Sequence, residues 1–591
     1  MNELDTIQIV LKRHRCDGTR LMQILREVQD ELGWLAPATL TAIAKGVGWP
    51  RAQVESTASF YSFFHTVPRG RYRVLWSNNI IDRMLGSRDL MVEMCRGLWI
   101  ERGRTSGDGL VSVDTTSCTG MGDQGPAVLV NYRAVSRMDM DRVEAMVGLI
   151  RAEVPLADWP AEWFHVDDNI RRRDRLLNHG LEPGAAIFAT LARGPEATLD
   201  EMRTAQLRGC GGAGFSMAAK WQACRDAPGD QRFIVCNADE GEPGTFKDRV
   251  LLNCHADLVF EGMTVAGLVV GAQRGFVYLR GEYRHLFEPL KSVLARRQAA
   301  GLLGDNILGS GRTFDIEVHL GAGAYICGEE SALIESLEGK RGIPRSRPPF
   351  PVTHGFLGQP TVVNNVETLA HAALIAARGG TWFAAVGTPQ STGTKLLSVS
   401  GDCTRPGIYE YPFGVTVRQV LEDCGADNIQ AVQVSGPSGT CIDASEFGRR
   451  LAYEDLPTAG AFMVFNHLRD LFEVARNFNH FFAHESCGFC TPCRVGTTLL
   501  RRMMDKIARG NGTRYEIDEI FDLIGVMKAT AHCGLGRTAG NPLEDTLHKF
   551  RPAWERHLKS LDFVPAFNLD GALAQARQMT RRDDVNAHLA P

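Results

Sequence analysis

The sequence predicts an α/β multidomain protein, and three observations support this prediction. The chain has 591 residues, which is several times the length of a typical domain of about 150 residues. Strand-like apolar runs alternate with helical patterns through the middle of the chain, as in an open α/β sheet. Both ends of the chain show mainly helical spacing. Length alone indicates about four domains, and the sequence motifs raise this number to five units.

The N-terminal region, residues 1–71, is expected to form a helical bundle. Apolar residues recur at helical spacing between Leu21 and Leu32, and turn-forming residues such as Gly33 and Pro37 follow them. This pattern predicts several short helices rather than one long helix.

Changes in residue composition and in the spacing of apolar residues divide the rest of the chain into units. Short β-rich runs follow the first bundle, a stretch rich in Pro, Trp, Arg and Asp comes next, and a long glycine-rich region alternates strands with helices. The expected units are a compact α/β unit at 72–150, a linker at 151–175, an α/β domain at 176–394, a second small α/β unit at 395–467, a helical bundle at 468–560 and a C-terminal extension at 561–591.

The composition excludes several classes of partner. With 65 Lys and Arg against 69 Asp and Glu, the formal charge is only −4, so no basic field attracts nucleic acid or anionic lipid. The most apolar run, Met263–Ala272, is shorter than the roughly 20 residues that cross a bilayer. Fifteen cysteines are too sparse for a disulfide scaffold, and no signal peptide is evident. We therefore expect a cytoplasmic protein without nucleic-acid or membrane partners.

The strongest chemical signal is a group of four cysteines near the C-terminus. Cys487, Cys490 and Cys493 form a C-x₂-C-x₂-C run, and Cys533 follows forty residues later. Three closely spaced thiolates and one remote thiolate suit the four corners of a [4Fe–4S] cluster. Structural zinc sites usually present two separated CxxC pairs, so zinc is the weaker alternative, and a disulfide is weaker still.

A glycine-rich stretch, Gly209–Phe215 (GCGGAGF), allows backbone N–H groups to approach a phosphate. Alone it is a weak signal, because the preceding Leu199–Leu207 looks helical and the usual strand–turn–helix context is missing. A structural turn is the simple alternative. Lys220 supports the phosphate interpretation, and so does the acidic stretch Cys236–Gly244 (CNADEGEPG) at the end of an apolar run, where carboxylates accept hydrogen bonds from ribose hydroxyls.

Further polar loops follow in the same domain. Gly321–Ser331 (GAGAYICGEES) again joins an apolar run to a helical pattern, and Thr361–Thr368 (TVVNNVET) carries two adjacent amides. Two glycine-rich stretches in one domain suggest one extended ligand. The cysteines without ligand spacing are assigned to packing: Cys16, Cys95, Cys224, Cys254, Cys403, Cys424 and Cys441.

Together and in order, these motifs resemble the flavin-bearing, NADH-oxidising subunit of respiratory complex I and its relatives in soluble hydrogenases and formate dehydrogenases. The resemblance covers about residues 176–560 and rests on RGCGGAGFSMAAKW, CNADEGEPGTFKDR, GAGAYICGEES, RPPFPVTHGFLGQPTVVNNVETL and ESCGFCTPCRVG. The preceding region is similar to the small thioredoxin-like partner subunit of complex I. Such a fusion looks like the diaphorase large subunit of cytoplasmic NAD-reducing [NiFe] hydrogenases.

The resemblance implies a fold and a set of cofactors. It implies a thioredoxin-like domain at 72–150, a Rossmann-like FMN/NAD domain at 176–394, a ubiquitin-like α/β domain at 395–467 and a C-terminal helical bundle that carries the cluster. It also implies FMN, one [4Fe–4S] cluster on Cys487, Cys490, Cys493 and Cys533, and NAD(H) as substrate.

The same resemblance implies the residues of the flavin and dinucleotide site. Phe215 and Phe350 are the expected aromatic faces for adenine, and Glu242 and Glu330 are the expected catalytic residues. Ala223 stands where the family commonly has a further aromatic residue, so one adenine contact is missing. The implied binding residues are Gly209, Gly211, Gly212, Gly214, Phe215, Lys220, Asn237, Asp239, Glu240, Glu242, Tyr325, Gly328, Glu329, Glu330, Phe350, Asn364 and Asn365.

The thioredoxin-like unit departs from the family pattern. The family holds a [2Fe–2S] cluster on four cysteines, and the matching positions here are Ser77, Asp82, Cys118 and Gly122. Only one of the four is a thiol, so we expect that this domain keeps the fold, has no [2Fe–2S] cluster and serves in docking.

The expected function is that of a diaphorase subunit. Hydride passes between NAD(H) and FMN, and single electrons pass through the four-iron cluster to a partner Fe–S-rich subunit and a [NiFe] hydrogenase heterodimer, giving H₂ + NAD⁺ = NADH + H⁺ overall. The alternatives are a diaphorase subunit of NAD-dependent formate dehydrogenase, a fused complex I subunit and a redox-inert NAD-binding scaffold. The sequence contains no nickel ligand set, so hydrogen chemistry would belong to a partner.

Overall fold

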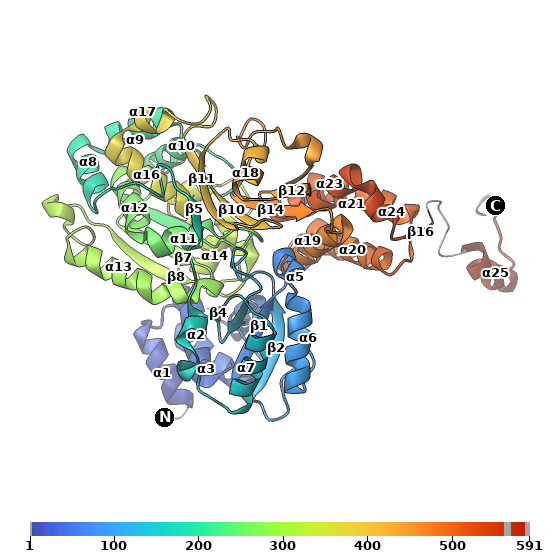
Figure 1. Cartoon of the computed structure of the whole chain (residues 1–591). Coiled ribbons are helices and arrows are strands. Elements are labelled where there is room, and N and C mark those ends of the chain that lie inside the picture. Colours follow the sequence, from blue (N-terminus) through green and yellow to red (C-terminus); the bar gives the residue numbers. More distant parts are fainter. Residues whose placement is uncertain (1–2, 561–568, 585–591) are drawn as a thin grey trace.

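The computed structural model describes residues 3–560 and 569–584, and it confirms the predicted mixed α/β multidomain class (Figure 1). Four short helices open the chain. Helix α2 buries an apolar stripe that includes Ile24 and Val28, and Gly33 ends it in the left-handed region at φ 82°. The four helices are α1 (Glu3–Arg13), α2 (Leu21–Leu32), α3 (Pro37–Val47) and α4 (Arg51–Phe60).

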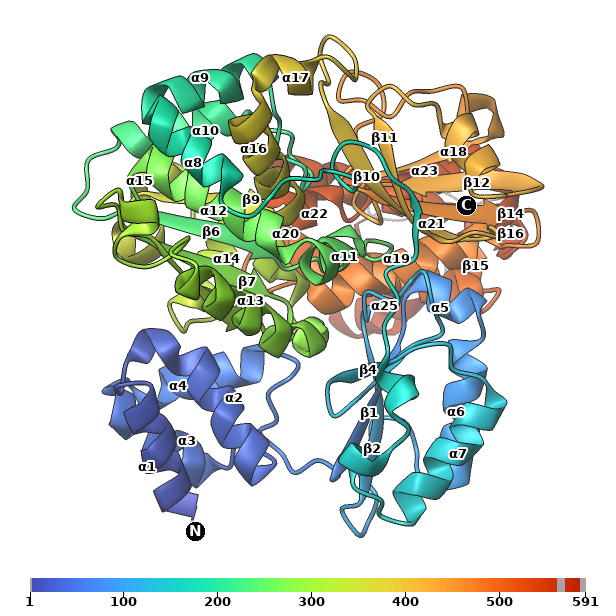
Figure 2. The ribbon, with the colours of Figure 1, turned by 60° about the vertical axis from the view of Figure 1, so that its left-hand side comes forward.

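The second unit is built on a four-stranded sheet in the order β2-β1-β3-β4. Strands β1 and β2 are parallel, while β3 pairs antiparallel with both β1 and β4. Its helices α6 and α7 pack against each other and against the sheet, and this unit stands beside the first helices below the large domain (Figure 2). The bounds are β1 (Tyr72–Ser77), β2 (Val111–Thr116), β3 (Val128–Val130), β4 (Arg133–Val135), α6 (Ser87–Leu98) and α7 (Met140–Arg151).

The segment expected to be a linker, residues 151–175, is largely ordered by its neighbours. Trp159 is 3% exposed and packs into the core of the second unit. Strand β5 (Ile170–Arg172) then pairs parallel with β11 (Gly407–Pro412) of the second small α/β unit. This segment therefore ties two units together, because its backbone groups find partners in a sheet far along the chain.

The large domain has a fully parallel sheet in the order β8-β7-β6-β9. Helices α12 and α16 pack against each other and are buried along nearly their whole length. Parallel strands end at one edge, so the loops after all four strands gather there. The bounds are β6 (Phe233–Ala238), β7 (Arg274–Leu279), β8 (Asp315–Leu320), β9 (Thr361–Asn365), α9 (Pro195–Ala205), α10 (Met217–Asp226), α11 (Lys247–Cys254), α12 (Ala256–Val270), α14 (Glu330–Leu337) and α16 (Val366–Arg378).

The second small unit has a mixed sheet in the order β13-β12-β14-β10-β11-β5, with helix α18 packed on it. Its strand β10 begins directly after the large domain, and helix α11 of that domain contacts it. The bounds are β10 (Thr394–Gly401), β12 (Ile429–Val434), β13 (Thr440–Asp443), β14 (Ala461–Asn466) and α18 (Val417–Asp423).

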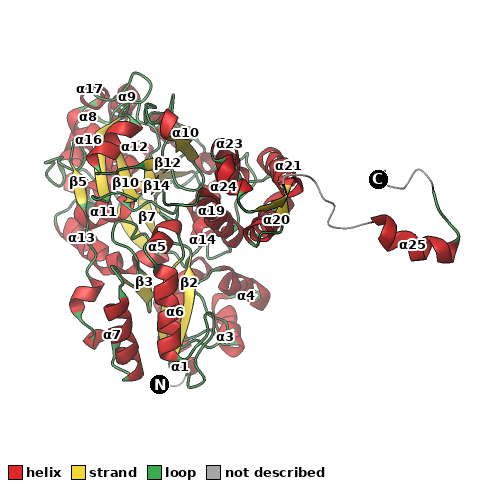
Figure 3. Ribbon diagram, turned by 45° about the vertical axis from the view of Figure 1, so that its right-hand side comes forward, coloured by secondary structure: helices red, strands yellow, loops and turns green. Residues whose placement is uncertain are grey.

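The C-terminal bundle packs its first helix, α19, against both α20 and α23. Part of the predicted C-terminal extension, residues 561–568 and 585–591, lies outside the described residues. Helix α25 (Leu569–Thr580) is drawn apart from the body of the molecule (Figures 1 and 3). Within the described ranges, no helix is long and apolar enough to cross a membrane. The bounds are α19 (Leu471–Glu485), α20 (Thr491–Ala508), α21 (Arg514–Thr530), α22 (Gly534–Thr538), α23 (Asn541–Lys549) and α24 (Arg551–Glu555).

Candidate functional site

Three predicted amide residues lie together at the carboxyl edge of the parallel sheet. Asn237 on β6 is the register partner of Asn365 on β9, and Asn364 precedes it. The Asn237 Nδ2 donates to the carbonyl of Gly328 at 2.8 Å. The Asn364 Oδ1 accepts from the indole N–H of Trp221 at 2.8 Å. The amides therefore fix the loops around this edge.

The glycine-rich loop is a closed turn above Asn365. The Gly209 N–H donates to the Phe215 carbonyl at 2.9 Å, and Gly214 has a φ of 61° that an L side chain rarely adopts. A Cβ on Gly211 would lie 3.1 Å from the Asn365 Cβ, so the loop approaches this residue closely. The loop follows helix α9 rather than a strand, which confirms that it is not an ordinary Rossmann turn.

A lysine and a glutamate from separate loops meet beside these amides. The Lys220 Nζ donates to Glu330 Oε2 at 2.8 Å and to the Val363 carbonyl at 3.0 Å. Both charged side chains are about four-fifths buried. The Arg347 guanidinium lies 3.5 Å from Glu330 and from Glu329. The pair places one fixed positive and one fixed negative charge at the same edge of the sheet.

Glu242 and Tyr325 form a second polar pair of the site. The Tyr325 hydroxyl donates to Glu242 Oε2, while the Ser438 N–H and hydroxyl donate to Glu242 Oε1 at 2.8 and 2.6 Å. Burial raises the pKa of the Glu242 carboxyl above its ordinary value. Burial likewise raises the pKa of Tyr325 well above its ordinary value, so the phenol keeps its proton.

Asp239 is buried without a partner for one of its oxygens. In the described part of the chain its Oδ2 has no hydrogen-bond partner, and burial raises the pKa of this carboxyl well above its ordinary value. A protonated acid donates as well as accepts a hydrogen bond. A Cβ on Gly328 would lie 3.4 Å from the Asp239 carbonyl, so little separates these loops. The unpartnered Asp239 oxygen can hydrogen-bond to a polar ligand, and the glycine backbone at Gly328 leaves room for one nearby. Both features fit a flavin cofactor.

Two predicted binding residues, Glu240 and Glu329, also hold neighbouring backbone segments in place. Glu240 accepts hydrogen bonds from the N–H groups of Asp248 and Arg249 at 2.9 and 3.1 Å and from the Tyr283 hydroxyl at 2.8 Å. Its carboxylate therefore caps the N-terminus of helix α11. Glu329 caps helix α14 in the same way, through the N–H groups that follow it. Both Glu240 oxygens therefore have protein partners, whereas the Glu329 Oε1 is buried without a hydrogen-bond partner in the described part of the chain.

The two predicted aromatic faces are exposed. Phe215 is 59% exposed and Phe350 is 50% exposed, values that are unusual for phenylalanines beside a packed core. Phe215 shares an open groove with Ala223, the position where the family commonly has an aromatic residue. The arrangement leaves apolar faces available for the flat base of a nucleotide.

The four cysteines near the C-terminus line one small cavity. Cys487 and Cys490 come from the loop between α19 and α20, Cys493 lies in the first turn of α20, and Cys533 is the N-cap of α22. A Cβ on Gly536 would lie 3.0 Å from the Cys493 Cβ, so the starts of α20 and α22 approach closely. Burial raises the pKa of the Cys493 thiol to about 12, and a bound cation supplies the charge that turns such thiols into ligands. The donor set fits a [4Fe–4S] cluster.

One turn connects the two sites. The 3₁₀ turn Tyr325–Gly328 places Tyr325 against Glu242 and Gly328 against Asn237, while Ile326 lines the cavity of the cysteines. The Tyr325 N–H also donates to Glu485 Oε2 at 3.0 Å, at the end of the helix that precedes the cysteine loop. The carboxyl edge of the parallel sheet and the cysteine cavity are therefore neighbours.

Several site residues have no local sequence signal. Ser438 and Tyr453 come from the second small α/β unit, and the Tyr453 hydroxyl donates to the Gly209 carbonyl at 3.1 Å. Lys247 is buried, and its Nζ lies 3.2 Å from the Asn365 Oδ1 and 2.6 Å from Asp248. Only tertiary structure brings these side chains to the loop, so no spacing rule finds them.

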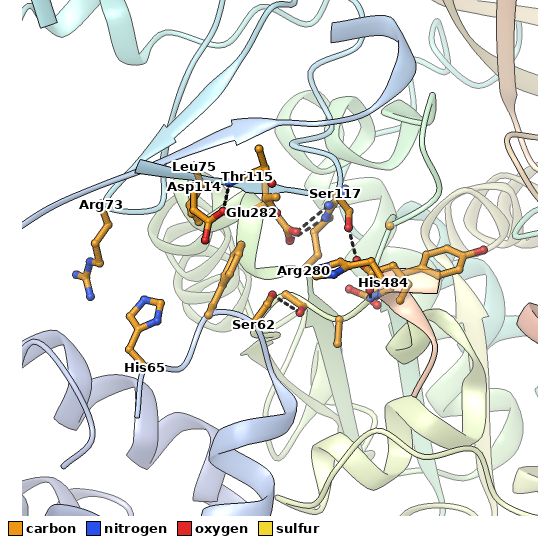
Figure 4. Close-up of a pocket in the computed structure, with 18 of the residues that line it drawn as sticks. Ser62, His65, Arg73, Leu75, Asp114, Thr115, Ser117, Arg280, Glu282 and His484 are labelled. Atoms are coloured by element: carbon orange, nitrogen blue, oxygen red, sulfur yellow. Dashed lines mark hydrogen bonds and ion pairs between the residues drawn. The ribbon is translucent and has the colours of Figure 1, made fainter. Parts of the chain in front are cut away.

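A cavity of about 220 Å³ lies between the carboxyl edge of the parallel sheet and the first two units (Figure 4). Asp239 and Tyr325 are among its lining residues. His65 and Arg73 lie together at one end of it, and Arg280 and His484 lie toward the other (Figure 4). Burial, with the charges of Arg73 and Arg69, lowers the pKa of His65 to about 3, so this imidazole is neutral.

A hydrogen-bonded network joins the second unit's candidate ligand positions. The Ser77 hydroxyl donates to Asp82 at 2.6 Å, and the Asn79 Nδ2 lies 2.7 Å from Asp82 and 3.1 Å from the Cys118 sulfur. Burial raises the pKa of Asp82 to about 6. Gly122 contributes no side chain.

The chain matches three family models in succession. Residues 7–151 match the thioredoxin-like [2Fe–2S] ferredoxin, residues 202–373 match the Nuo51 FMN-binding domain, and residues 473–557 match the NADH-ubiquinone oxidoreductase-F iron–sulfur binding region. The order of the matches is the order of the units described above.

Relatives of known identity match over most of the chain. The NAD-reducing hydrogenase HoxS subunit alpha of Cupriavidus necator is 42% identical over 96% of this chain and 97% of the relative. A subunit of the NADH-quinone oxidoreductase of Aquifex aeolicus is 40% identical over 64% of this chain and 90% of the relative. A crystal structure of an NAD⁺-reducing [NiFe]-hydrogenase in the H₂-reduced state superimposes with a TM-score of 0.89 at 43% identity, covering 97% of this chain and 98% of that chain.

One expectation is corrected by these matches. The sequence analysis predicted no [2Fe–2S] cluster in the second unit, and the match of residues 7–151 to a [2Fe–2S] ferredoxin model contradicts this prediction. The prediction relied on four positions alone, whereas the family model describes the whole unit. Ser77, Asp82 and Cys118 are hydrogen-bonded as described above and do not form a set of four thiolates, so no electron-transfer step is assigned to this unit.

Proposed function

The chain belongs to the family that includes the NAD-reducing hydrogenase alpha subunits and the matching NADH-quinone oxidoreductase subunits, and from this premise we propose that it is the diaphorase subunit of a soluble NAD-reducing hydrogenase. In this role it exchanges a hydride between NAD(H) and FMN and delivers single electrons to a partner Fe–S subunit. The match over nearly the full length of both the hydrogenase alpha subunit and the hydrogenase chain of known structure supports this assignment over the alternatives.

FMN is proposed to bind at the carboxyl edge of the parallel sheet. The glycine-rich loop at Gly209–Gly214, the amides of Asn237 and Asn365 and the buried Asp239 carboxyl, whose pKa is raised by burial, would hold it. The Cys487, Cys490, Cys493 and Cys533 thiols would hold a [4Fe–4S] cluster. When bound, FMN exchanges a hydride with NAD(H) and exchanges electrons singly with the cluster, which is the chemistry that the protein itself lacks.

The chain's own residues bind and orient the reactants. The exposed faces of Phe215 and Phe350 receive the adenine ring, and Lys220 supplies a positive charge for a phosphate. Glu330 and Glu242 are the candidate acceptors for ribose or carboxamide hydrogens. Glu242 is held by Ser438, so it keeps its position when a ligand displaces the Tyr325 hydroxyl. No residue of the chain is required to transfer a proton to the substrate.

The turn Tyr325–Gly328 is the observation that carries this proposal. Its first residue, Tyr325, is bonded to Glu242, and its last residue, Gly328, is bonded to Asn237 at the proposed FMN site. Ile326, between these two residues, lines the cysteine cavity. A site that only binds NAD has no need for a neighbouring cysteine cavity with four ligands. The geometry therefore favours electron transfer over a redox-inert scaffold.

The proposed partners are a small Fe–S-rich diaphorase subunit and a [NiFe] heterodimer in the cytoplasm. In and just after the cysteine loop, Phe489 is 54% exposed, Val495 42% and Leu499 37%. These side chains give an apolar surface close to the proposed cluster, from which electrons would pass to the partner. The formate dehydrogenase and complex I alternatives share the same site, so only the partners distinguish them. Nickel in the purified native complex would support hydrogenase, molybdenum or tungsten would support formate dehydrogenase, and membrane subunits would support complex I.

Diaphorase activity tests the proposal directly. The purified full-length chain, reconstituted with FMN and iron–sulfur clusters, is expected to reduce viologen or ferricyanide with NADH. Reconstituted protein without this activity would support the scaffold alternative instead.

A further inference from the structure

The N-terminal helical unit binds the edge of the parallel sheet in the large domain. Strand β8 is the edge strand of this sheet, and side chains at the start of helix α2 lie along it. Arg20, directly before α2, forms an ion pair with Glu317 of β8. The Gln23 amide nitrogen lies 3.3 Å from the His319 Nδ1. These contacts cover an edge that would otherwise present unpaired backbone groups.

One turn further along α2, Arg26 binds the backbone at the point where β8 ends. Its Nη2 donates to the carbonyls of Leu320 and Gly321, each at 2.6 Å. Burial, with the charge of the nearby Arg284, lowers the pKa of Arg26 to about 10, so the guanidinium is still charged at neutral pH. The neighbouring Asp30 is bonded to Arg284. Hydrogen bonds from a charged donor are stronger than those between neutral groups, so this guanidinium fixes both carbonyls.

Two further residues of the N-terminal unit hold the next part of the same loop. The Phe63 N–H donates to the Ala322 carbonyl at 3.1 Å. The Ser62 N–H and hydroxyl donate to the Gly323 carbonyl at 3.3 and 2.6 Å. The packing is close, because a Cβ on Gly323 would lie 2.4 Å from the Ser62 Oγ. The four successive carbonyls of residues 320–323 therefore all accept hydrogen bonds from the N-terminal unit.

This loop leads directly into the turn that joins the proposed FMN site to the cysteine cavity. Ala324 alone separates the four bonded carbonyls from Tyr325. The Tyr325 hydroxyl donates to Glu242, and its N–H donates to Glu485 at 3.0 Å. The backbone before Tyr325 sets the direction in which this side chain leaves the chain. A loop that is already held in one conformation loses less conformational entropy when a ligand binds to it.

We propose that Arg26 is a positioning residue for the FMN site, which acts through the carbonyls of Leu320 and Gly321 on the turn Tyr325–Gly328. This inference rests on the proposed function, because it concerns the site at which FMN is proposed to bind. Arg26 is not a ligand of the cofactor in this account. It preorganises the loop from a separate helical unit, so that FMN meets Tyr325 and Gly328 in their bound positions. Without the guanidinium, FMN binding has to order the loop, and the affinity falls.

Two variants separate this role from simple attachment of the N-terminal unit. Arg26→Met removes both hydrogen bonds to the loop, whereas the matched control Arg20→Met removes the ion pair with Glu317 and leaves the loop contacts in place. Titration of the cofactor-free full-length protein with FMN is expected to give a dissociation constant about 5- to 20-fold higher in Arg26→Met and less than about 2-fold higher in Arg20→Met. Equal weakening in the two variants, or wild-type affinity in Arg26→Met, overturns the proposal. A wild-type chain that does not bind FMN would refute the proposed function, and this inference with it.

Hydrogen exchange of the cofactor-free protein gives a readout that does not depend on FMN. Peptides that cover residues 320–328 should exchange their amide hydrogens about 10-fold faster in Arg26→Met than in the wild type, while exchange in β6 and α16 stays unchanged. Ser62→Ala removes one neutral donor to Gly323 and should speed exchange in the same peptides to a smaller extent, which keeps the test decisive if Arg26→Met does not fold. Wild-type exchange in residues 320–328 of the folded variants, or faster exchange spread over the whole domain, contradicts a positioning role.

Discussion

Substituting alanine for Gly209 or Gly328 tests whether FMN packs against these two glycines. An added methyl group that has room in the cofactor-free protein can lower FMN affinity only by meeting the cofactor. A Cβ on Gly209 would have its nearest neighbour at 3.7 Å, and a Cβ on Gly328 would have its nearest neighbour at 3.4 Å. Both are ordinary van der Waals distances, and neither residue has a positive φ. Gly209→Ala and Gly328→Ala should therefore leave the folding of the cofactor-free protein almost unchanged.

The same methyl groups should interfere with FMN. If the cofactor packs against these backbones, an added methyl overpacks the contact by about 1–3 kcal/mol. Since about 1.4 kcal/mol corresponds to a tenfold change in affinity, FMN binding should weaken by about 5- to 150-fold. Fluorescence titration of the cofactor-free protein with FMN measures the affinity, and thermal unfolding of the same protein measures the stability.

Two further glycines provide controls. Gly525 in helix α21 has no atom within 4 Å of a Cβ, so Gly525→Ala should raise stability by about 0.5–1 kcal/mol and leave FMN affinity unchanged. Gly214→Ala should destabilise the protein even without FMN, because its φ is 61° and the Cβ would lie 2.5 Å from Tyr453. FMN affinity at the wild-type level in both Gly209→Ala and Gly328→Ala would refute the proposed cradle.

Four more substitutions test other parts of the site. Cys490→Ser should remove the visible absorbance of the four-iron cluster while FMN stays bound, and an unchanged iron content would contradict the ligand assignment. Lys220→Met removes the 2.8 Å ion pair with Glu330 and should raise the KM for NADH by about 10-fold, measured as ferricyanide reduction, whereas an unchanged KM would argue against a phosphate contact. Phe350→Ala should also raise the KM, by about 5- to 10-fold, while kcat stays nearly constant, and a fall in kcat alone would exclude an adenine-binding role. Asp239 has a raised pKa, so the folded protein holds a proton that the unfolded chain releases above about pH 4, and stability is lost as the pH rises. The stabilising effect of Asp239→Asn on urea unfolding should therefore grow as the pH rises above about 4, and an effect independent of pH would show that the pKa of this carboxyl is not raised.

The sequence predicted best those features that depend on local pattern. Glycine loops that follow apolar runs identified the edge of the sheet, because the ends of parallel strands gather the loops around a ligand. The cysteine spacing identified Cys487, Cys490 and Cys493, and their cavity with Cys533 is formed as expected. The helical stretch before Gly209 was also identified correctly as α9.

The features that the sequence did not predict depend on tertiary partners. Residues Ile170–Arg172 carry no distinctive strand pattern and become a strand only because β11 is available to pair with them. Glu240 remains a predicted dinucleotide ligand, and its hydrogen bonds with the N–H groups of helix α11 and with Tyr283 had no signal in the sequence. Ser438 and Tyr453 reach the site from another unit, so their roles cannot be inferred from their positions in the chain.

The link between the flavin edge and the cysteine cavity is the central claim, and anaerobic reduction of the full-length reconstituted chain by NADH tests it most directly. The absorbance spectrum should show flavin together with broad iron–sulfur bands, and NADH should bleach the flavin and supply electrons for viologen reduction. The Cys490→Ser variant should still bleach at the flavin and lose most of its viologen reduction. A wild-type chain whose flavin is not bleached by NADH, or a Cys490→Ser variant with full viologen reduction, would contradict the account.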